Sequence, residues 1–510
     1  MMILTYVAAM VVLLGLCIFI HELGHLLGGK MVGIKARVFS MGYGKGVLKK
    51  KVGDTTYQVT LIPFGGYCQF YGENPTEDRK GESFEFLSAA PWRRIVTVVM
   101  GPLFNLFFGI IIFFAMNMIG YESETNRVLI PERLMSGEHM AAAAKAGMVS
   151  GDRIIRIDNR EIADFEDIQA RVLFSEGRAL KVTVERGNEK KELTVTPKLM
   201  KRSGHYAMGI RPYGDKIVIA GVGHGDVAEA SGLQGMDVVV NLDGKEIGNE
   251  QEFIDYIKPR AGKKIVMTIL RRGEEKQVVI TPRVNRLITI NGNAIMDMDN
   301  LQKLVRTMAL SRDGERVYSA DNFIEFINKN KDKEVTLTYE KIKISGKINY
   351  DDRGYIGASP TINPHKVLIQ YGIGKSAVQA LVDPYDFIVM NLKGFGMIFS
   401  GQMSLRENLS GPIRIAQIAG DVAYYKGLSA FILLMAKISI ILMVMNLLPI
   451  PAVDGSHLVF YLIEMIRRKP INQKIMERIQ VAGVLILITI GVFVIINDIS
   501  MLPAIQRLFN

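Results

Sequence analysis

The stretch FIHELGHLLG, residues 19–28, places two histidines and a glutamate at the end of an apolar segment. Residues 1–20 carry no charged side chain, and no turn signal separates them from His21. His21 and His25 are four positions apart, so on a helix they share one face and can reach a single metal ion. Glu22 lies beside them and can accept a proton from a metal-bound water. The spacing therefore predicts a zinc site with Glu22 as the catalytic base.

Apolar segments of similar length recur along the chain. A helix that crosses a bilayer needs about 20 predominantly apolar residues, and four windows meet that length: 3–25, 95–120, 427–449 and 479–497. They predict a polytopic α-helical membrane protein with four transmembrane helices. A cleavable signal peptide is the alternative for the first window, but this window lacks a basic start and a small-residue cleavage site before its histidine.

The net charge of +11 is distributed unevenly. Lysines and arginines gather in residues 30–51, 93–94 and 467–474, and the positive-inside rule places these loops in the cytoplasm. Both termini and residues 121–426 are then expected on the outer side. Because no basic run carries interleaved aromatic residues, nucleic-acid binding is not predicted. Neither of the two cysteines lies in the outer segment, which excludes a disulfide framework there.

The outer segment contains an internal repeat. DRIIRIDNREI (152–162) and DVVVNLDGKEI (237–247) match in pattern. Each follows a small-residue helix that ends in glycine, and each precedes an amphipathic helix and two alternating strands. The pattern resembles circularly permuted bacterial PDZ domains and predicts tandem PDZ-like α+β domains over 121–213 and 214–284. An unrelated β-rich domain duplicated in tandem is the alternative.

Two further segments complete the insert. A rougher copy over residues 285–350 lacks the small-residue helix and is predicted to be a third, partial PDZ-like unit. Residues 375–400 are apolar but carry four charged side chains, so residues 351–426 are predicted to be an interfacial amphipathic region.

A zinc site with two histidines and a water lacks one protein ligand. The stretch MNLLPIPAVDGSHL, residues 445–458, offers two candidates, Asp454 and His457. Pro449 and Pro451 cannot continue a helix, so the backbone opens near membrane depth, where irregular backbone is tolerated only inside protein or along a wet cavity. Residue types alone favour Asp454 and leave His457 open.

These motifs resemble the site-2 protease family of intramembrane zinc metalloproteases, in its bacterial branch with PDZ domains. The HExxH motif of the family stands at residues 21–25, and its NxxPxPxLDG motif stands at 446–455 with Val453 in place of leucine. The site that this resemblance implies has Zn²⁺ on His21, His25 and Asp454, catalysis by Glu22, and substrate contacts at Asn446, Pro449, Gly65 and Gly66.

Shorter motifs extend the resemblance. GPLFN (101–105) resembles the GPxxN of the family, in which small residues let helices pack closely. GYGKG (42–46) and LIPFGGYCQF (61–70) resemble the re-entrant β-loop that pairs with an extended substrate. The same glycines would also suit the turns of an interfacial hairpin.

The resemblance implies cleavage of transmembrane segments of single-span proteins, such as an already trimmed anti-sigma factor, in a stress response at the bacterial inner membrane. A membrane-anchored metallopeptidase for soluble or signal-peptide substrates is one alternative, and a non-enzymatic PDZ scaffold with a relic site is another. A relic need not keep both motifs intact, which argues against the scaffold. The outer units are expected across a hydrocarbon core of about 30 Å, so they cannot supply catalytic groups. We expect them to exclude substrates with bulky outer domains, and binding of a newly exposed C-terminus is the alternative.

Overall fold

The chain forms two compact units, Met1–Arg211 with Lys366–Leu502, and Pro212–His365. The structure is a computed structural model, and it describes residues 2–74, 80–131, 134, 140–200, 205–223, 225–271, 273–291, 293–297, 310–312, 315–316, 320–339, 342–401, 411–469 and 471–500.

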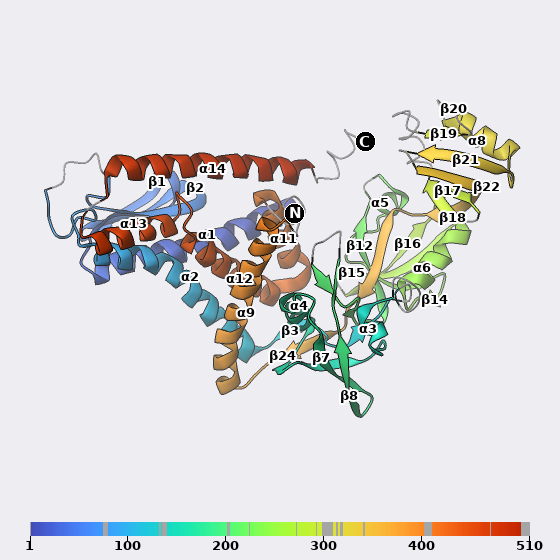
Figure 1. Cartoon of the computed structure of the whole chain (residues 1–510), viewed down its shortest axis with the longest axis horizontal. Helices are drawn as coiled ribbons and strands as arrows, with labels where there is room; N and C mark the ends of the chain where they lie inside the picture. Colours follow the sequence, from blue (N-terminus) through green and yellow to red (C-terminus); the bar gives the residue numbers. More distant parts are fainter. Residues whose placement is uncertain are drawn as a thin grey trace. The chain divides into compact units, whose positions relative to one another are not determined.

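Long apolar helices dominate the first unit (Figure 1). They are α1 (Met2–Met31), α2 (Pro91–Ile119), α9 (Ile373–Phe399), α11 (Pro412–Asp421), α12 (Gly427–Leu447), α13 (Asp454–Arg467) and α14 (Gln473–Ser500). Four segments are long and apolar enough to cross a membrane: Leu4–Met31, Pro91–Ile119, Pro412–Leu447 and Lys474–Ser500. The four predicted spans are therefore confirmed.

The third span begins earlier than predicted. A π-helical turn over Val422–Lys426 joins α11 to α12, so the apolar helical segment starts at Pro412 and not at residue 427. Such turns insert into a helix without ending it. The four charges of residues 375–400 fall on α9, which is helical as expected and is not among the four candidate spans.

The predicted β-loop is a twisted meander beside α1. The antiparallel strands β1 (Ala36–Val52) and β2 (Thr55–Phe70) are long and bent. As a result Phe39, near the start of β1, pairs with both Tyr57 and Cys68 of β2. The start of β1 thus lies in the middle of the meander, and the end of β2 forms one of its edges.

Two repeats of one αβ pattern follow, as predicted. In the first repeat the elements are α3 (Ala142–Lys145), β5 (Arg153–Ile157), β6 (Arg160–Glu161), α4 (Phe165–Phe174), β7 (Leu180–Arg186) and β8 (Glu189–Val195). In the second repeat they are α5 (Val227–Ala230), β13 (Val238–Leu242), β14 (Lys245–Glu246), α6 (Glu250–Ile257), β15 (Ile265–Arg271) and β16 (Glu274–Ile280). The first repeat also carries β3 (Tyr121–Glu124), β4 (Val128–Leu129), β9 (Lys198–Leu199) and β10 (Tyr206–Ala207), and β11 (Arg211–Pro212) follows it.

The same buried ion pair stabilises both repeats. Asp152 accepts two hydrogen bonds from Arg186, at 2.7 and 2.8 Å. Asp237 accepts two from Arg271, at 2.7 and 2.6 Å. Both aspartates are almost fully buried, and a bidentate arginine satisfies the oxygens of each. The recurrence of this pair at matching positions of the two repeats supports a duplication.

The described strands between Arg283 and Tyr355 form a sheet of their own, within a few residues of the predicted third unit. A separate six-stranded sheet has the order β18-β17-β22-β21-β19-β20. Its elements are β17 (Arg283–Ile290), β18 (Asn293–Asp297), β19 (Leu310–Arg312), β20 (Glu315–Arg316), α8 (Ala320–Lys329), β21 (Glu334–Tyr339) and β22 (Ile342–Tyr355). Residues 298–309, 313–314, 317–319 and 340–341 of the predicted third unit lie outside the described residues.

The start of the predicted interfacial region is strand and not helix. β23 (Ala358–Asn363) pairs with β12 (Lys216–Val222) and completes the sheet of the second repeat. β24 (Lys366–Ile369) pairs with β3 beside the first repeat. These pairings join segments that are far apart in the sequence, so a local sequence pattern could not reveal them. Helix begins only at α9.

Candidate metal centre

The third candidate ligand is held where a helix is interrupted. α12 ends at Leu447, and α13 begins at Asp454 after the Pro-rich segment, as the two prolines predicted. α14 supports this opening, because Gln480 accepts a hydrogen bond from the Ala452 backbone at 2.9 Å. Gly483 packs so closely on Pro451 that a Cβ would collide with it. The interruption therefore has fixed partners on a neighbouring helix.

Two histidines of α1 meet Asp454 at this point. The Nε2 atoms of His21 and His25 are 3.1 Å apart. Asp454 Oδ2 lies 3.0 Å from His21 Nε2 and 3.4 Å from His25 Nε2. The ligand atoms of these three residues all lie within 4.8 Å of one another. No other group of three histidine, cysteine or acidic side chains among the described residues converges in this way. The structure thus brings together the three predicted ligands.

The outer nitrogens of the histidines have partners on α2. His25 Nδ1 lies 3.0 Å from the Thr97 carbonyl oxygen, which can only accept, so Nδ1 carries the proton. His21 Nδ1 lies 3.4 Å from the Asn105 amide, which can present its oxygen to an Nδ1–H in the same way. Contacts of this kind fix the tautomer of metal-binding histidines, so that Nε2 is unprotonated and its lone pair is available to a metal.

Three acceptors then face one another. With both Nε2 atoms unprotonated, the buried Asp454 Oδ2 has no hydrogen-bond donor, in agreement with its lack of a hydrogen-bond partner among the described residues. A cation between these atoms removes the conflict. Two imidazole nitrogens and one carboxylate oxygen form the three-ligand set of a catalytic zinc site, in which a fourth position stays open. The residues therefore fit zinc.

Close helix packing makes the arrangement possible. Gly24 of α1 and Gly101 of α2 each lack the space for a Cβ, the first against the Met100 backbone and the second against the His25 ring. The GPLFN motif thus does more than allow packing, because its last residue, Asn105, faces His21. Asn105 is fully buried within an apolar span. A polar residue inside an apolar span is a signal of function that the sequence already carries, although Asn105 was not among the predicted site residues.

A cavity of about 480 Å³ opens onto the three ligands. Glu22 and Asn446, both predicted, line it, together with Tyr67, Glu73 and His457. His457 lies outside the three-residue cluster, and its Nδ1 is buried without a hydrogen-bond partner among the described residues. The geometry therefore favours Asp454 over His457 as the third ligand.

The edge of the β-meander reaches Glu22. Gly66 lies next to the Glu22 side chain. Further along β2, the Phe70 amide donates to Glu73 at 2.8 Å. Glu73 therefore caps this edge of the strand, close to Glu22. Sequence reasoning missed Glu73, which follows a strand in an ordinary turn.

The remaining predicted substrate residues lie nearby but outside the cavity wall. Gly65 adopts a φ of +95°, which favours glycine, and packs against the Tyr43 ring. Pro449 lies in the segment between α12 and α13. Neither residue lines the cavity.

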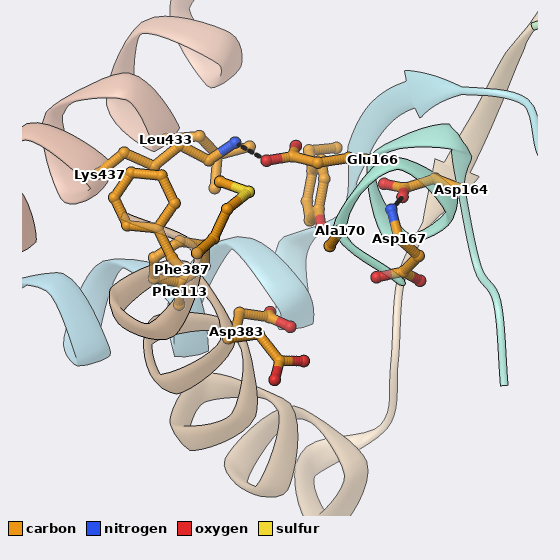
Figure 2. Close-up of a pocket in the computed structure, with 12 residues that line it drawn as sticks. Phe113, Asp164, Glu166, Asp167, Ala170, Asp383, Phe387, Leu433 and Lys437 are labelled. Carbon is orange, nitrogen blue, oxygen red and sulfur yellow. Dashed lines mark hydrogen bonds and ion pairs between the residues drawn. The ribbon is translucent and has the colours of Figure 1, made fainter. Parts of the chain in front are cut away.

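A second group of carboxylates, which ranges from the buried Asp164 to the exposed Glu166, lies in the same unit, where α4 of the first repeat meets α9 and α12 (Figure 2). We call it the acidic cluster, and its members are Asp164, Glu166, Asp167, Asp383 and Asp386. Glu166 pairs with Lys437 of α12, and Asp386 pairs with Arg171 of α4. Burial raises the pKa of Asp167 to about 7 and that of Asp383 to about 6.

Comparison with known proteins agrees with this chemistry. Peptidase family M50 matches residues 9–490. A candidate zinc metalloprotease of Treponema pallidum is 26% identical over 96% of this chain and 98% of its own length. The regulator of sigma-E protease RseP of Escherichia coli is 25% identical over 97% of this chain and 98% of its own length. The chain therefore belongs to peptidase family M50 and is a metalloprotease of the site-2 type.

Proposed function

We propose that the chain is an intramembrane zinc endopeptidase that cuts transmembrane segments of membrane-protein substrates. The observation that carries the proposal is the convergence of His21, His25 and Asp454 beside a cavity that Glu22 also lines. His21, Glu22 and His25 lie within the candidate span Leu4–Met31, and Asp454 begins α13, a few residues after the candidate span that ends at Leu447.

The proposed roles follow from the donor set. His21, His25 and Asp454 would hold the zinc, and zinc bound there would supply a Lewis acid for water activation and for polarisation of the scissile carbonyl. Glu22 accepts the proton of the attacking water and returns it to the leaving amine. Asn446, whose side chain is placed along the same cavity, orients the substrate backbone.

The substrate binds as an extended strand. A transmembrane helix hides its amides in internal hydrogen bonds, so it must unwind before water can attack. The end of β2 provides an edge for strand addition next to Glu22, near Gly65 and Gly66. In the free enzyme the Glu73 carboxylate accepts the hydrogen bond of the Phe70 amide on that edge. The incoming strand displaces Glu73 from this amide.

The substrate is inferred from the names of the relatives, and the orientation in the membrane is inferred from the charges of the loops. Because the relative from Escherichia coli is named regulator of sigma-E protease, we infer that a trimmed anti-sigma factor is the substrate. The enzyme lies in the bacterial inner membrane, with the active site toward the cytoplasm and the termini and PDZ-like domains outside. That sidedness rests on the lysines and arginines of residues 30–51 and 467–474.

The test separates zinc binding from catalysis. Glu22→Gln should lower cleavage of a single-span substrate in proteoliposomes at least about 100-fold, because the general base is lost. Bound zinc should stay near one per chain. Glu477→Gln, at another carboxylate that lines the cavity, is the matched control and should keep activity. Full activity of Glu22→Gln would refute the proposed mechanism.

A further inference from the structure

A second hollow lies on the outer part of the β-meander, away from the three metal ligands. It has a volume of about 410 Å³ and is lined by Phe19, Phe39, Met41, Leu48, Lys49, Lys50, Tyr57, Gln58 and Val59. Phe19 belongs to α1 and contacts the Phe39 ring edge-on at 5.7 Å between centroids. The hollow is therefore a groove between a membrane-spanning helix and the face of a sheet.

Strand register divides the groove into two rows. Met41 and Leu48 both pair with Val59, which forms an apolar row. Phe39 and Lys50 both pair with Tyr57, which forms a row that ends in a charge. The apolar row is unusually open to solvent, with 40% of Met41, 43% of Val59 and 67% of Leu48 exposed. Exposed apolar surface of this kind in a membrane protein indicates contact with lipid or with a partner.

The rows have a defined direction relative to α1. Phe70, which pairs with Ala36 at the start of β1, packs on Gly29 near the end of α1. Gly66, which pairs with Met41, lies beside Ile18 in the apolar body of the helix. The apolar row is therefore deeper along the span than the row that ends in Lys50. This order matches a phospholipid, whose acyl chains lie deep and whose phosphate lies at the surface.

The charges beside the groove are unbalanced. The meander exposes four lysines on and beside its outer turn: Lys45, Lys49, Lys50 and Lys51. No described carboxylate forms an ion pair with any of them, whereas Lys35 pairs with Asp54 at 2.9 Å. A fifth cation, Lys30, borders the same face and donates to the Tyr57 hydroxyl at 2.9 Å. Clustered lysines at a membrane surface attract anionic lipids.

We propose that this groove binds an anionic phospholipid. Its acyl chain packs along Met41, Val59 and Leu48, and its phosphate lies at the charged end of the second row, beside Lys50 and Lys30 and within the field of Lys49. The lipid fills the space between α1 and the outer strands and supports the meander whose other edge reaches Glu22. The proposal depends on the membrane location of the chain and not on the identity of its substrate.

The experiment uses the full-length protein in nanodiscs that contain equal amounts of phosphatidylglycerol and phosphatidylcholine. Native mass spectrometry after release counts the lipids of each kind that stay bound. The parent should retain phosphatidylglycerol preferentially. Because each lysine near an anionic surface contributes about one kcal/mol, Lys49→Gln with Lys50→Gln should reduce that preference about 30-fold.

Two further variants complete the test. Lys263→Gln with Lys264→Gln removes the same charge from two exposed lysines of the other unit and should leave the preference unchanged. Leu48→Ser should reduce retention of both lipids, because it weakens the acyl-chain contact. Zinc content verifies that each variant is folded. Equal retention of the two lipids by the parent, or equal losses in the two lysine pairs, would overturn the proposal.

Discussion

The metal centre and the acidic cluster both bury carboxylates in the same unit, but they do so in opposite ways. In the metal centre, one carboxylate oxygen meets two imidazole nitrogens within 3.4 Å. In the acidic cluster, the carboxylates bind local donors: Asp164 accepts from Ser123 and Asp167 from the Ala163 amide. No three ligand atoms of the cluster converge within 4.8 Å among the described residues.

These two arrangements favour different ligands. Convergent acceptors without a hydrogen between them need a cation, and neutral histidines suit zinc. Dispersed carboxylates in a low-dielectric site are instead neutralised one at a time by protons or by paired cations. We therefore expect the first group to respond to metal and the second to pH and salt.

The largest effect should come from the ligand that distinguishes the two groups. Asp454→Ala leaves only two protein ligands, so zinc affinity should fall by more than about 100-fold, beyond the usual cost of losing an outer contact. His457→Ala should keep its zinc, because His457 lies outside the cluster. Metal analysis of both purified variants tests this. Loss of zinc only in His457→Ala would reverse the assignment.

Two asparagines of α2 allow a matched test of the two groups. Asn105 faces His21, whereas Asn117 donates to Asp383 at 3.2 Å, and both are fully buried. Asn105→Ala should lower zinc affinity about 10-fold to 100-fold through loss of the outer contact. Asn117→Ala should leave zinc affinity unchanged. Competition with a chelator measures both, and equal losses would show a general packing effect.

The acidic cluster should make docking of the first repeat depend on pH. Burial raises the pKa of Asp383 to about 6 and that of Asp167 to about 7, from an ordinary value near 3.8. The docked state therefore binds more protons than the separated state. Docking is strongest below about pH 4 and weakens as pH rises to about 7.

Hydrogen exchange in α4 and α9 measures this docking. Between pH 5 and pH 8 the docked state should lose up to about 4 kcal/mol, after correction for intrinsic exchange rates, because Asp167 loses about two pKa units of stabilisation in this range and Asp383 about one. Asp383→Asn keeps the shape and removes one titrating group, so it should reduce the slope. Asp255→Asn, at an exposed carboxylate of α6, is the control. An unchanged slope in Asp383→Asn would assign the dependence elsewhere.

Sequence reasoning identified most of the metal centre because its signals are local. HExxH and the Pro-rich turn each occupy one short, continuous stretch, and a charge in an apolar span is conspicuous. The acidic cluster could not be predicted from the sequence, because its members come from segments that are far apart in the chain. Asp164 and Asp167 fit an ordinary helix cap, which Asp164 indeed forms with the Asp167 amide. Their packing against α9 gives these side chains a further role. In the sequence, α9 comes only after the whole of the second unit, so no local pattern links it to Asp164 and Asp167.

The same argument applies to the insert. The internal repeat was predictable because both copies carry the pattern, whereas β23 and β24 are short strands whose partners lie far away in sequence. The separate sheet of β17 to β22 had only a partial pattern. Local periodicity predicts elements, and long-range pairing decides to which sheet each element belongs.

The smallest effect should come from the ion pairs at the rim of the acidic cluster. Lys437 of α12 pairs with Glu166, whose side chain is 54% exposed. Such pairs contribute less than about 1 kcal/mol and are screened by salt. Lys437→Met should therefore weaken docking slightly at low salt and by a smaller amount at about 0.5 M salt, where an exposed pair is partly screened.

A second exposed ion pair, between α9 and the segment that follows α4, provides the comparison. Lys393 of α9 donates to Glu176 at 2.8 Å, with the glutamate 69% exposed. Lys393→Met should have an equal or smaller effect in the same hydrogen-exchange assay. If Lys437→Met lowers the docking free energy by the same amount at high salt as at low salt, this lysine is desolvated within its apolar helix. In that case Glu166 neutralises a buried charge, and the acidic cluster contains one fixed pair in addition to its titrating carboxylates.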